Sequence, residues 1–261
     1  FILIRVLGAT IIFWIASLFF KSEKINTPDY KKIFFASLFG VALNMLAFFK
    51  GLSLTTPISA SVMMVMAPIM VLIFSSIIIK KAIGKQRVLG VFIGLIGTIL
   101  LITFGNSSTT SSTNNNLGNF LVFINAASYG LYLVLAKDLI AKYNAITFIK
   151  WFYLFGLILV FPFGYYEFSE ISWSNIPPNI YWNIGFVVIF TTCATYLFNL
   201  FGLSKLKPTT VSVFIYLQPV IATVFALITG SDSLSLVKIS AMIIIFLGVY
   251  LVTKQVDKST K

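Results

Sequence analysis

Long apolar stretches separated by short polar connectors run along the whole chain. A helix that crosses the hydrocarbon core of a membrane needs about 20 mostly apolar residues, and the stretches have close to that length. The pattern therefore predicts nine membrane-spanning helices, over 1–20, 33–52, 57–79, 88–104, 117–136, 145–165, 180–203, 209–229 and 237–253.

The apolar stretches are organised as a repeat. The tripeptide Gly-Leu-Ser at 51–53 returns at 202–204, an offset of 151 residues (202 − 51), and no gap is needed to align the residues that follow. Matched pairs are Pro57 with Pro208, Ser61 with Ser212, Pro68 with Pro219, Gly97 with Gly248 and Leu100 with Leu251. Two copies of one unit in a membrane are a common construction of transport proteins.

Composition supports a membrane environment. The chain is 59% hydrophobic and 10% charged, with a mean hydropathy of +0.99, whereas soluble domains carry about 25% charged residues. The net charge of +12 would suit a nucleic-acid partner if it formed one basic face. The basic residues instead lie between apolar stretches, so a lipid bilayer is the expected partner and nucleic acid is not.

The distribution of Lys and Arg predicts the orientation. Connectors 20–32 and 80–87 and the C-terminal tail are rich in lysine, whereas 105–116 and 166–179 have no Lys or Arg. Basic connectors face the cytoplasm. We therefore expect a multi-pass protein of the cell (inner) membrane with a cytoplasmic C-terminus.

The repeat also predicts topology. The second copy has five spans from 117 onward but the first has four, so one helix of about 20 residues is expected to be missing before Phe1. An odd number of spans per copy inverts the second copy relative to the first. The predicted fold is an all-α membrane protein with ten helices in a 5+5 inverted repeat, nine of them present here. Its parts are 1–104 (first repeat without its first helix), 105–116 (external polar linker), 117–254 (second, inverted repeat) and 255–261 (cytoplasmic tail).

The residues of the repeat resemble a known family. Along the repeat, the features occur in the order Gly-x-x-x-x-x-Pro, a Ser, a mid-helix Pro, a charged turn and a glycine-rich helix. In addition, Arg5-x-x-x-Ala9 resembles the opening of the second family helix. This is similar to the EamA-type branch of the drug/metabolite transporter superfamily. The family often has a Glu after the helix with the mid-span Pro; Asp232 keeps an acid there, whereas Lys81 replaces it in the first copy.

The resemblance implies a 5+5 inverted-repeat carrier with both termini inside. It implies export of small metabolites such as amino acids or drugs, by alternating access of one repeat against the other. Two alternatives stay open. One is a carrier of nucleotide sugars or other phosphorylated metabolites, which would need a buried Lys or Arg and for which Lys150 is the nearest candidate. The other is a non-transporting membrane scaffold or sensor.

Polar and aromatic residues near mid-span are the candidates for a substrate-binding cavity between the repeats. Amide side chains favour the cavity, because in lipid they would be left unpaired. The tyrosines equally fit interfacial or packing positions, and the methionine equally fits helix packing. The candidate residues are Asn44, Phe48, Met64, Tyr129, Tyr132, Tyr196, Asn199, Tyr216 and Gln218.

Pro68 and Pro219 occupy matched positions in the two copies. A proline inside a helix removes one hydrogen bond and frees the carbonyl one turn back, here that of Met64 or Ile215. In lipid such a carbonyl needs protein or cavity water as its partner. The pair is therefore predicted to form kinks that act as hinges or widen a cavity.

Charged side chains are expected at the ends of spans rather than inside them. Asp138, Glu167, Glu170 and Asp232 all fall at segment ends or in connectors, which argues against a proton relay through a buried carboxylate. The chain has no His and one Cys, so we predict no catalytic residue, no metal ion and no cofactor. The protein is not expected to be an enzyme.

Gly90 and Gly94 form a GxxxG pattern, and Gly97 extends the same small face. Such a face lets two helices approach closely. Packing against a neighbouring helix of the same chain is the favoured interpretation, and a homodimer through Gly90 and Gly94 is the alternative.

Overall fold

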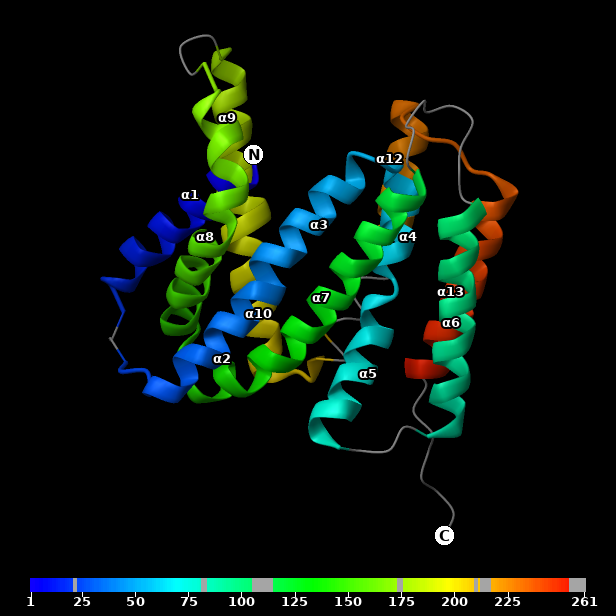
Figure 1. Ribbon diagram of the computed structural model, residues 1–261, viewed down its shortest axis with the longest axis horizontal. Coiled ribbons are helices and arrows are strands. Elements are labelled where there is room, and N and C mark those ends of the chain that lie inside the picture. Colours follow the sequence, from blue (N-terminus) through cyan, green and yellow to red (C-terminus); the bar gives the residue numbers. More distant parts are fainter. Residues whose placement is uncertain are drawn as a thin grey trace. The chain divides into compact units, whose positions relative to one another are not determined.

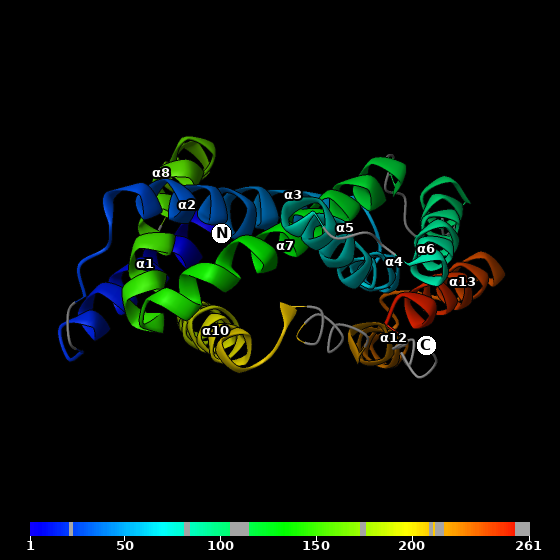
Figure 2. The ribbon, with the colours of Figure 1, turned by 90° about the horizontal axis from the view of Figure 1, so that it is seen from below.

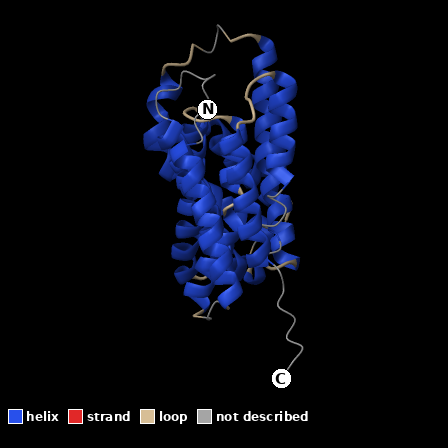
Figure 3. Cartoon of the chain, turned by 90° about the vertical axis from the view of Figure 1, so that its right-hand side faces the viewer, coloured by secondary structure: helices blue, strands red, loops and turns tan. Residues whose placement is uncertain are grey.

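The computed structural model describes residues 1–20, 23–80, 84–104, 115–172, 176–208, 211 and 217–253. Every element in these ranges is a helix, as the ribbon views and the cartoon show (Figure 1, Figure 2 and Figure 3). Six described helical segments are long and apolar enough to cross a membrane: Thr27–Leu52, Pro57–Ile78, Lys85–Phe104, Asn115–Lys142, Ala145–Ser169 and Pro178–Lys205. This confirms the predicted all-α membrane fold.

A described helix lies in each of the nine predicted spans. Several helices run further than predicted: α2 begins at Thr27 rather than at 33, α7 ends at Lys142 rather than at 136, and α8 ends at Ser169 rather than at 165. Polar residues at the end of a span lower its hydropathy without ending the helix. The elements are α1 (Ile2–Ser17), α2 (Thr27–Ser37), η1 (Leu38–Ala42), α3 (Leu43–Leu52), α4 (Pro57–Met64), α5 (Ala67–Ile79), α6 (Lys85–Phe104), α7 (Asn115–Lys142), α8 (Ala145–Ser169), α9 (Pro178–Phe186), η3 (Val187–Ala194), α10 (Thr195–Lys205), α12 (Leu217–Thr229) and α13 (Leu236–Thr253). Most of the linker predicted at 105–116, and the tail predicted at 255–261, lie outside the described residues.

The chain folds into two compact units, and each takes helices from both halves of the sequence. Unit 1 consists of Phe1–Leu46 and Tyr132–Val211, and unit 2 of Ala47–Leu131 and Ser212–Lys261. The chain therefore does not fold as one copy of the repeat followed by the other.

In unit 2, α6 and α13 lie side by side (Figure 1 and Figure 2). Gly90 is against Gly248, and Gly97, further along α6, is against Ile245, an earlier residue of α13. The two helices therefore run in opposite directions. Since the offset of 151 residues makes them equivalent helices of the two copies, this packing is what an inverted repeat requires.

The contacts of the same glycines show what the GxxxG face of α6 packs against within the chain. A Cβ on Gly248 would lie 2.5 Å from the backbone nitrogen of Gly94 and 2.7 Å from the carbonyl oxygen of Gly90. Packing on a neighbouring helix of the same chain is thus confirmed. A homodimer through Gly90 and Gly94 stays a prediction, and it would have to compete with α13 for this face.

The rest of unit 2 forms an apolar core. Helix α4 packs against α12, and α7 adds buried side chains such as Val122 and Ala126. The predicted span 57–79 is interrupted: α4 ends at Met64, and α5 begins at Ala67, just before Pro68. At the other end of this span Pro57 opens α4, and the Thr56 hydroxyl accepts a hydrogen bond from the backbone N–H of Ser59 (3.3 Å), which caps the helix.

Unit 1 repeats the antiparallel arrangement. Helix α1 packs against α8, its equivalent at the offset of 151 residues. Leu3, near the start of α1, is against Gly164 near the end of α8. Trp14, near the end of α1, is in edge contact with Trp151 near the start of α8, with ring centroids 5.4 Å apart. The equivalent helices are again inverted, and the predicted fold class is confirmed in both units.

Each copy of the repeat also contains a π-helical segment at the matching place. Segment η1 covers Leu38–Ala42, and the offset of 151 residues maps it to 189–193, inside η3. A π-helical turn shifts the hydrogen-bond ladder by one residue, and such segments are frequent at functional sites. The side chains packed around η1 and η3 are therefore candidates for a functional site.

A polar contact in unit 1 joins α2 to the C-terminal end of α7. The Asp29 carboxylate accepts hydrogen bonds from the Lys142 ammonium and from the Tyr143 hydroxyl (2.7 Å). Asp29 precedes the predicted span 33–52, at the cytoplasmic level expected from the basic connector.

Candidate functional site

Arg5 of α1 is a half-buried charged side chain of unit 1. Its Nε donates a hydrogen bond to the hydroxyl of Thr192 in η3 (3.0 Å), and its Nη2 donates to the carbonyl oxygen of Thr191 (3.4 Å). Thr192 is fully buried. The guanidinium is therefore held in a fixed orientation by neutral acceptors on the π-helical segment.

An aromatic pair lies toward one end of α1. Trp side chains concentrate at membrane interfaces, and the Trp14 and Trp151 rings are in edge contact in unit 1, where the Lys150 ammonium lies 5.4 Å from the Trp14 ring centroid. Arg5 is nine residues from Trp14 along α1, a distance of about 13 Å at 1.5 Å per residue, so it lies toward the other end of this helix.

Tyr153 of α8 and Tyr196 of α10 complete a group that we call the Arg5 cluster: Arg5, Tyr153, Thr192 and Tyr196. The two tyrosine rings meet edge to face with centroids 5.2 Å apart. Tyr153 is completely buried. Its hydroxyl has no hydrogen-bond partner within the described part of the chain. A buried polar group without a partner lowers the stability of the fold by about 1–3 kcal/mol.

In each π-helical segment, a backbone carbonyl oxygen accepts a hydrogen bond from a side chain of the Arg5 cluster. The Tyr196 hydroxyl donates a hydrogen bond to the carbonyl oxygen of Gly40 in η1 (2.7 Å). Thr191, which accepts from Arg5, is the residue equivalent to Gly40 at the offset of 151 residues. One side chain of the Arg5 cluster thus binds the same carbonyl in each copy of the repeat.

Aromatic rings surround the Arg5 cluster. Tyr132 and Phe152 are buried, with centroids 5.2 Å apart, and Phe152 lies 6.0 Å from Tyr196. Gly40 leaves the space for them: a Cβ there would lie 2.5 Å from the Tyr132 ring and 2.7 Å from the Phe152 ring. The sequence-predicted tyrosines Tyr132 and Tyr196 are brought together here, with centroids 6.4 Å apart.

The other predicted site residues are divided between the units. Asn44 and Asn199 belong to unit 1 and are half-buried. Phe48, Met64, Tyr129 and Gln218 belong to unit 2. There Met64 and Tyr129 pack against the apolar core, Phe48 contacts the ring of Phe49, and Gln218 is exposed. Tyr216 lies outside the described residues.

The matched prolines are both buried. The chain is interrupted just before Pro68, where the backbone N–H groups of Val65 and Met66 donate to the carbonyl oxygens of Val62 and Met63, three residues back. Pro219 lies in the first turn of α12, and residues 212–216 before it are outside the described ranges.

A charged pair is buried in unit 2. Asp232 lies in the connector between α12 and α13, as the sequence predicts. Its side chain and that of Lys238 are nevertheless both 0% exposed and form an ion pair of 2.6 Å. The Asp232 carboxylate also accepts from the backbone N–H groups of Ile58 (3.3 Å) and Ser233 (2.7 Å). The N-terminus of α4 and a lysine thus compensate the carboxylate, which makes its burial tolerable.

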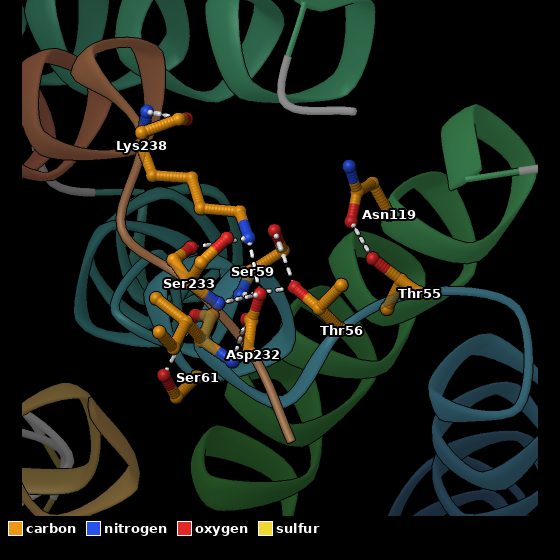
Figure 4. A network of polar contacts seen from close by, with 10 residues as sticks. Thr55, Thr56, Ser59, Ser61, Asn119, Asp232, Ser233 and Lys238 are labelled. Carbon is orange, nitrogen blue, oxygen red and sulfur yellow. Dashed lines mark hydrogen bonds and ion pairs between the residues drawn. The ribbon is translucent and has the colours of Figure 1, made fainter. Parts of the chain in front are cut away.

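Neutral polar side chains surround the ion pair (Figure 4). Lys238 also donates to the carbonyl oxygen of Ser233 (3.0 Å). Thr56 and Ser59 share a hydrogen bond of 3.0 Å next to Asp232, and Asn119 of α7 accepts from Thr55. The network ties the connector before α13 to the start of α4, so it holds together elements from both halves of the chain.

No group of three His, Cys, Asp or Glu side chains that could hold a metal ion occurs in the ranges that the structure describes. Unit 1 brings together a hydrogen-bonded arginine, tyrosine hydroxyls and aromatic rings.

The comparisons with known proteins agree with this class of fold. The model of the EamA-like transporter family matches residues 1–103 and 116–254. The chain is 26% identical over 224 residues to the uncharacterized transporter YyaM of Bacillus subtilis, covering 86% of this chain and 72% of that protein. It is 27% identical over 233 residues to an uncharacterized transporter of Archaeoglobus fulgidus, covering 89% and 81%.

A more distant relative is a WAT1-related protein of Arabidopsis thaliana, 24% identical over 249 residues, covering 85% of this chain and 66% of that protein. A solved crystal structure matches 97% of this chain and 87% of its own chain with a TM-score of 0.61 at 20% identity, a likeness of fold alone. The protein is thus a helical, multi-pass membrane protein of transporter type. It belongs to the EamA-like transporter family.

Sequence reasoning missed three members of the Arg5 cluster: Arg5, Tyr153 and Thr192. A signal for Arg5 was available, because an ionisable residue inside a membrane span marks a functional site by default. The π-helical segments and the orphan hydroxyl of Tyr153 depend on which helices touch, and no local pattern encodes them.

Proposed function

We propose that this protein carries small metabolites, such as amino acids or drugs, out of the cell by alternating access between its two inverted repeats. In this proposal the repeats are 1–104 and 117–254, joined by an external linker at 105–116, and the tail 255–261 lies in the cytoplasm. The observation that carries the proposal is the antiparallel packing of equivalent helices in both units, α1 with α8 and α6 with α13, because inverted repeats are how many carriers expose one site to two sides.

The proposed substrate site lies beside the Arg5 cluster. Tyr132 and Tyr196 support it by their place around that cluster, and the half-buried amides of Asn44 and Asn199 are the other proposed contacts in unit 1. The remaining proposed contacts are Phe48, Met64, Tyr129, Tyr216 and Gln218. Pro68 and Pro219 are proposed as hinges, supported at Pro68 by the interruption between α4 and α5.

Counterflow in proteoliposomes tests the proposed function. Vesicles loaded with one unlabelled solute from a panel of amino acids, related metabolites and drugs are expected to accumulate the same labelled solute, with saturation. Protein-free liposomes and vesicles without internal solute are the controls. If no member of a broad panel gives saturable flux, the transport function is contradicted and a scaffold or sensor role is favoured.

A further inference from the structure

We propose that the buried ion pair of Asp232 and Lys238 is a one-sided latch of the transport cycle. It holds the start of α4 against the α12–α13 connector (residues 230–235) in the resting state, and it opens when these elements separate at that end of unit 2. The latch joins the two proposed repeats, because α4 lies in 1–104 and the connector lies in 117–254. The proposal rests on the transport function above and adds how the resting state is set.

The bonds of the Asp232 carboxylate reach both repeats. One oxygen accepts from the backbone N–H of Ile58, the second residue of α4 (3.3 Å). The other accepts from the Lys238 ammonium in the first turn of α13 (2.6 Å) and from the backbone N–H of Ser233 (2.7 Å). Separation of α4 from the connector would therefore break the bond to Ile58 and admit water to a pair whose side chains are 0% exposed.

A buried ion pair has the properties of a reversible contact. It is a weak source of stability, because both charges lose their hydration when they are buried. When the helix ends separate, water hydrates the two charges again and returns part of that cost, whereas an apolar contact of the same size only loses its burial on opening. The pair thus closes this end of unit 2 specifically and still lets it open.

The connector is tied to α4 through one side chain. Asp232 is buried, whereas its neighbours Ser231, Ser233 and Leu234 are exposed. Gly230 before them has a left-handed backbone conformation (φ 64°), and among the described residues nothing lies within 4 Å of a Cβ added there. The turn therefore has room to move once the carboxylate is released.

The repeat indicates that the latch exists at one end only. At the offset of 151 residues Asp232 corresponds to Lys81, and Lys238 corresponds to Arg87. The first copy thus has two cations where the second has a carboxylate and an ammonium, so the same ion pair cannot form there. Equivalent connectors of an inverted repeat lie at opposite faces of the membrane. The resting carrier is therefore expected to be closed at the end that has the pair and open toward the opposite face.

Cysteine labelling tests the latch without requiring a known substrate. The reporter is Ser61→Cys in the Cys193→Ser background, because Ser61 is one turn along α4 from Ile58, is 8% exposed and bonds within its own helix. The control is Thr98→Cys in α6 of the same unit, because Thr98 is 2% exposed and also bonds within its own helix. A membrane-impermeant maleimide is applied from the side that labels Ser231→Cys.

With the pair intact, Ser61→Cys is expected to react slowly. Lys238→Met and Asp232→Asn each leave a buried charge without its counter-ion, and water entering at this end would hydrate it. Each is therefore expected to raise the labelling rate of Ser61→Cys about tenfold or more. The double variant Asp232→Asn/Lys238→Met removes both charges, so its rate should stay within about threefold of the rate with the pair intact. Thr98→Cys should react equally slowly in all four backgrounds.

The proposal is overturned if neither single variant raises the labelling rate of Ser61→Cys, or if the double variant is labelled as fast as the single ones. It is also overturned if Thr98→Cys becomes as reactive as Ser61→Cys, since the pair would then stabilise the fold alone. If Lys238→Met does not reach the membrane, Asp232→Asn decides the matter by the same comparison. Failure of the transport function would appear separately, as this labelling pattern in a protein without counterflow.

Discussion

Lys238→Met is expected to lower the free energy of unfolding by about 3–5 kcal/mol, the usual effect of removing one partner of a buried ion pair. Both side chains of the Asp232–Lys238 pair are 0% exposed, so the substitution would leave the Asp232 carboxylate buried without its cation. The remaining donors, the backbone N–H groups of Ile58 and Ser233, compensate only part of the charge. Thermal or denaturant unfolding in detergent measures the change.

The matched control is Lys32→Met, which removes the cation of a pair whose lysine side chain is 66% exposed. An exposed pair contributes about 0–1 kcal/mol, so this variant should unfold almost like the wild-type protein. The double variant Asp232→Asn/Lys238→Met should recover part of the loss, because it removes both charges. Equal effects of Lys238→Met and Lys32→Met would show that the pair is not buried as described.

Gly248→Ala is expected to lower the free energy of unfolding by about 1–3 kcal/mol, the cost of overpacking a closely packed interface. The new methyl group would lie 2.5 Å from the backbone nitrogen of Gly94 and 2.7 Å from the carbonyl oxygen of Gly90. Both are backbone atoms, so no side chain can turn away, and α6 and α13 would have to move apart. The same unfolding measurement applies.

The control is Gly185→Ala in α9, where nothing lies within 4 Å of the added Cβ. Alanine is the better helix former by about 1 kcal/mol, so this variant should be as stable as the wild-type protein or slightly more stable. A stable Gly248→Ala protein would mean that α6 and α13 do not approach as closely as described.

Much of the fold is accessible from the sequence. Hydropathy predicts the spans because the hydrocarbon core admits only long apolar helices. The inversion follows from an odd number of spans in each copy, and the antiparallel pairs α1 with α8 and α6 with α13 agree with it. Pro68 likewise predicts the interruption that separates α4 from α5, since a proline cannot continue the hydrogen-bond ladder.

The site is less accessible, for a physical reason. Tyr132 and Tyr196 come from different helices, and Arg5 and Thr192 come from different halves of the chain, so only the packing of the helices brings each pair together. Hydropathy also places Asp232 in a connector and says nothing of whether that connector is buried. A periodic pattern reports the environment of one helix, whereas a binding site is defined by contacts between helices.

The two halves thus share a fold but differ in chemistry. The π-helical segments η1 and η3 are matched in position, yet the helix beside η3 carries Arg5 and the helix beside η1 carries Gly156. Duplication explains the shared backbone, and the substitutions explain how one copy supplies a charge and the other a tightly packed contact.

The inverted arrangement is tested most directly by labelling single cysteines from each side of the membrane. In a Cys193→Ser background, Lys85→Cys reports the turn before α6 and Ser231→Cys reports the turn before α13; both residues are exposed. Because α6 and α13 are equivalent and antiparallel, a membrane-impermeant maleimide applied to intact cells is expected to label Ser231→Cys only, and Lys85→Cys only after the membrane is opened. Labelling of both cysteines from the same side would contradict the inverted repeat.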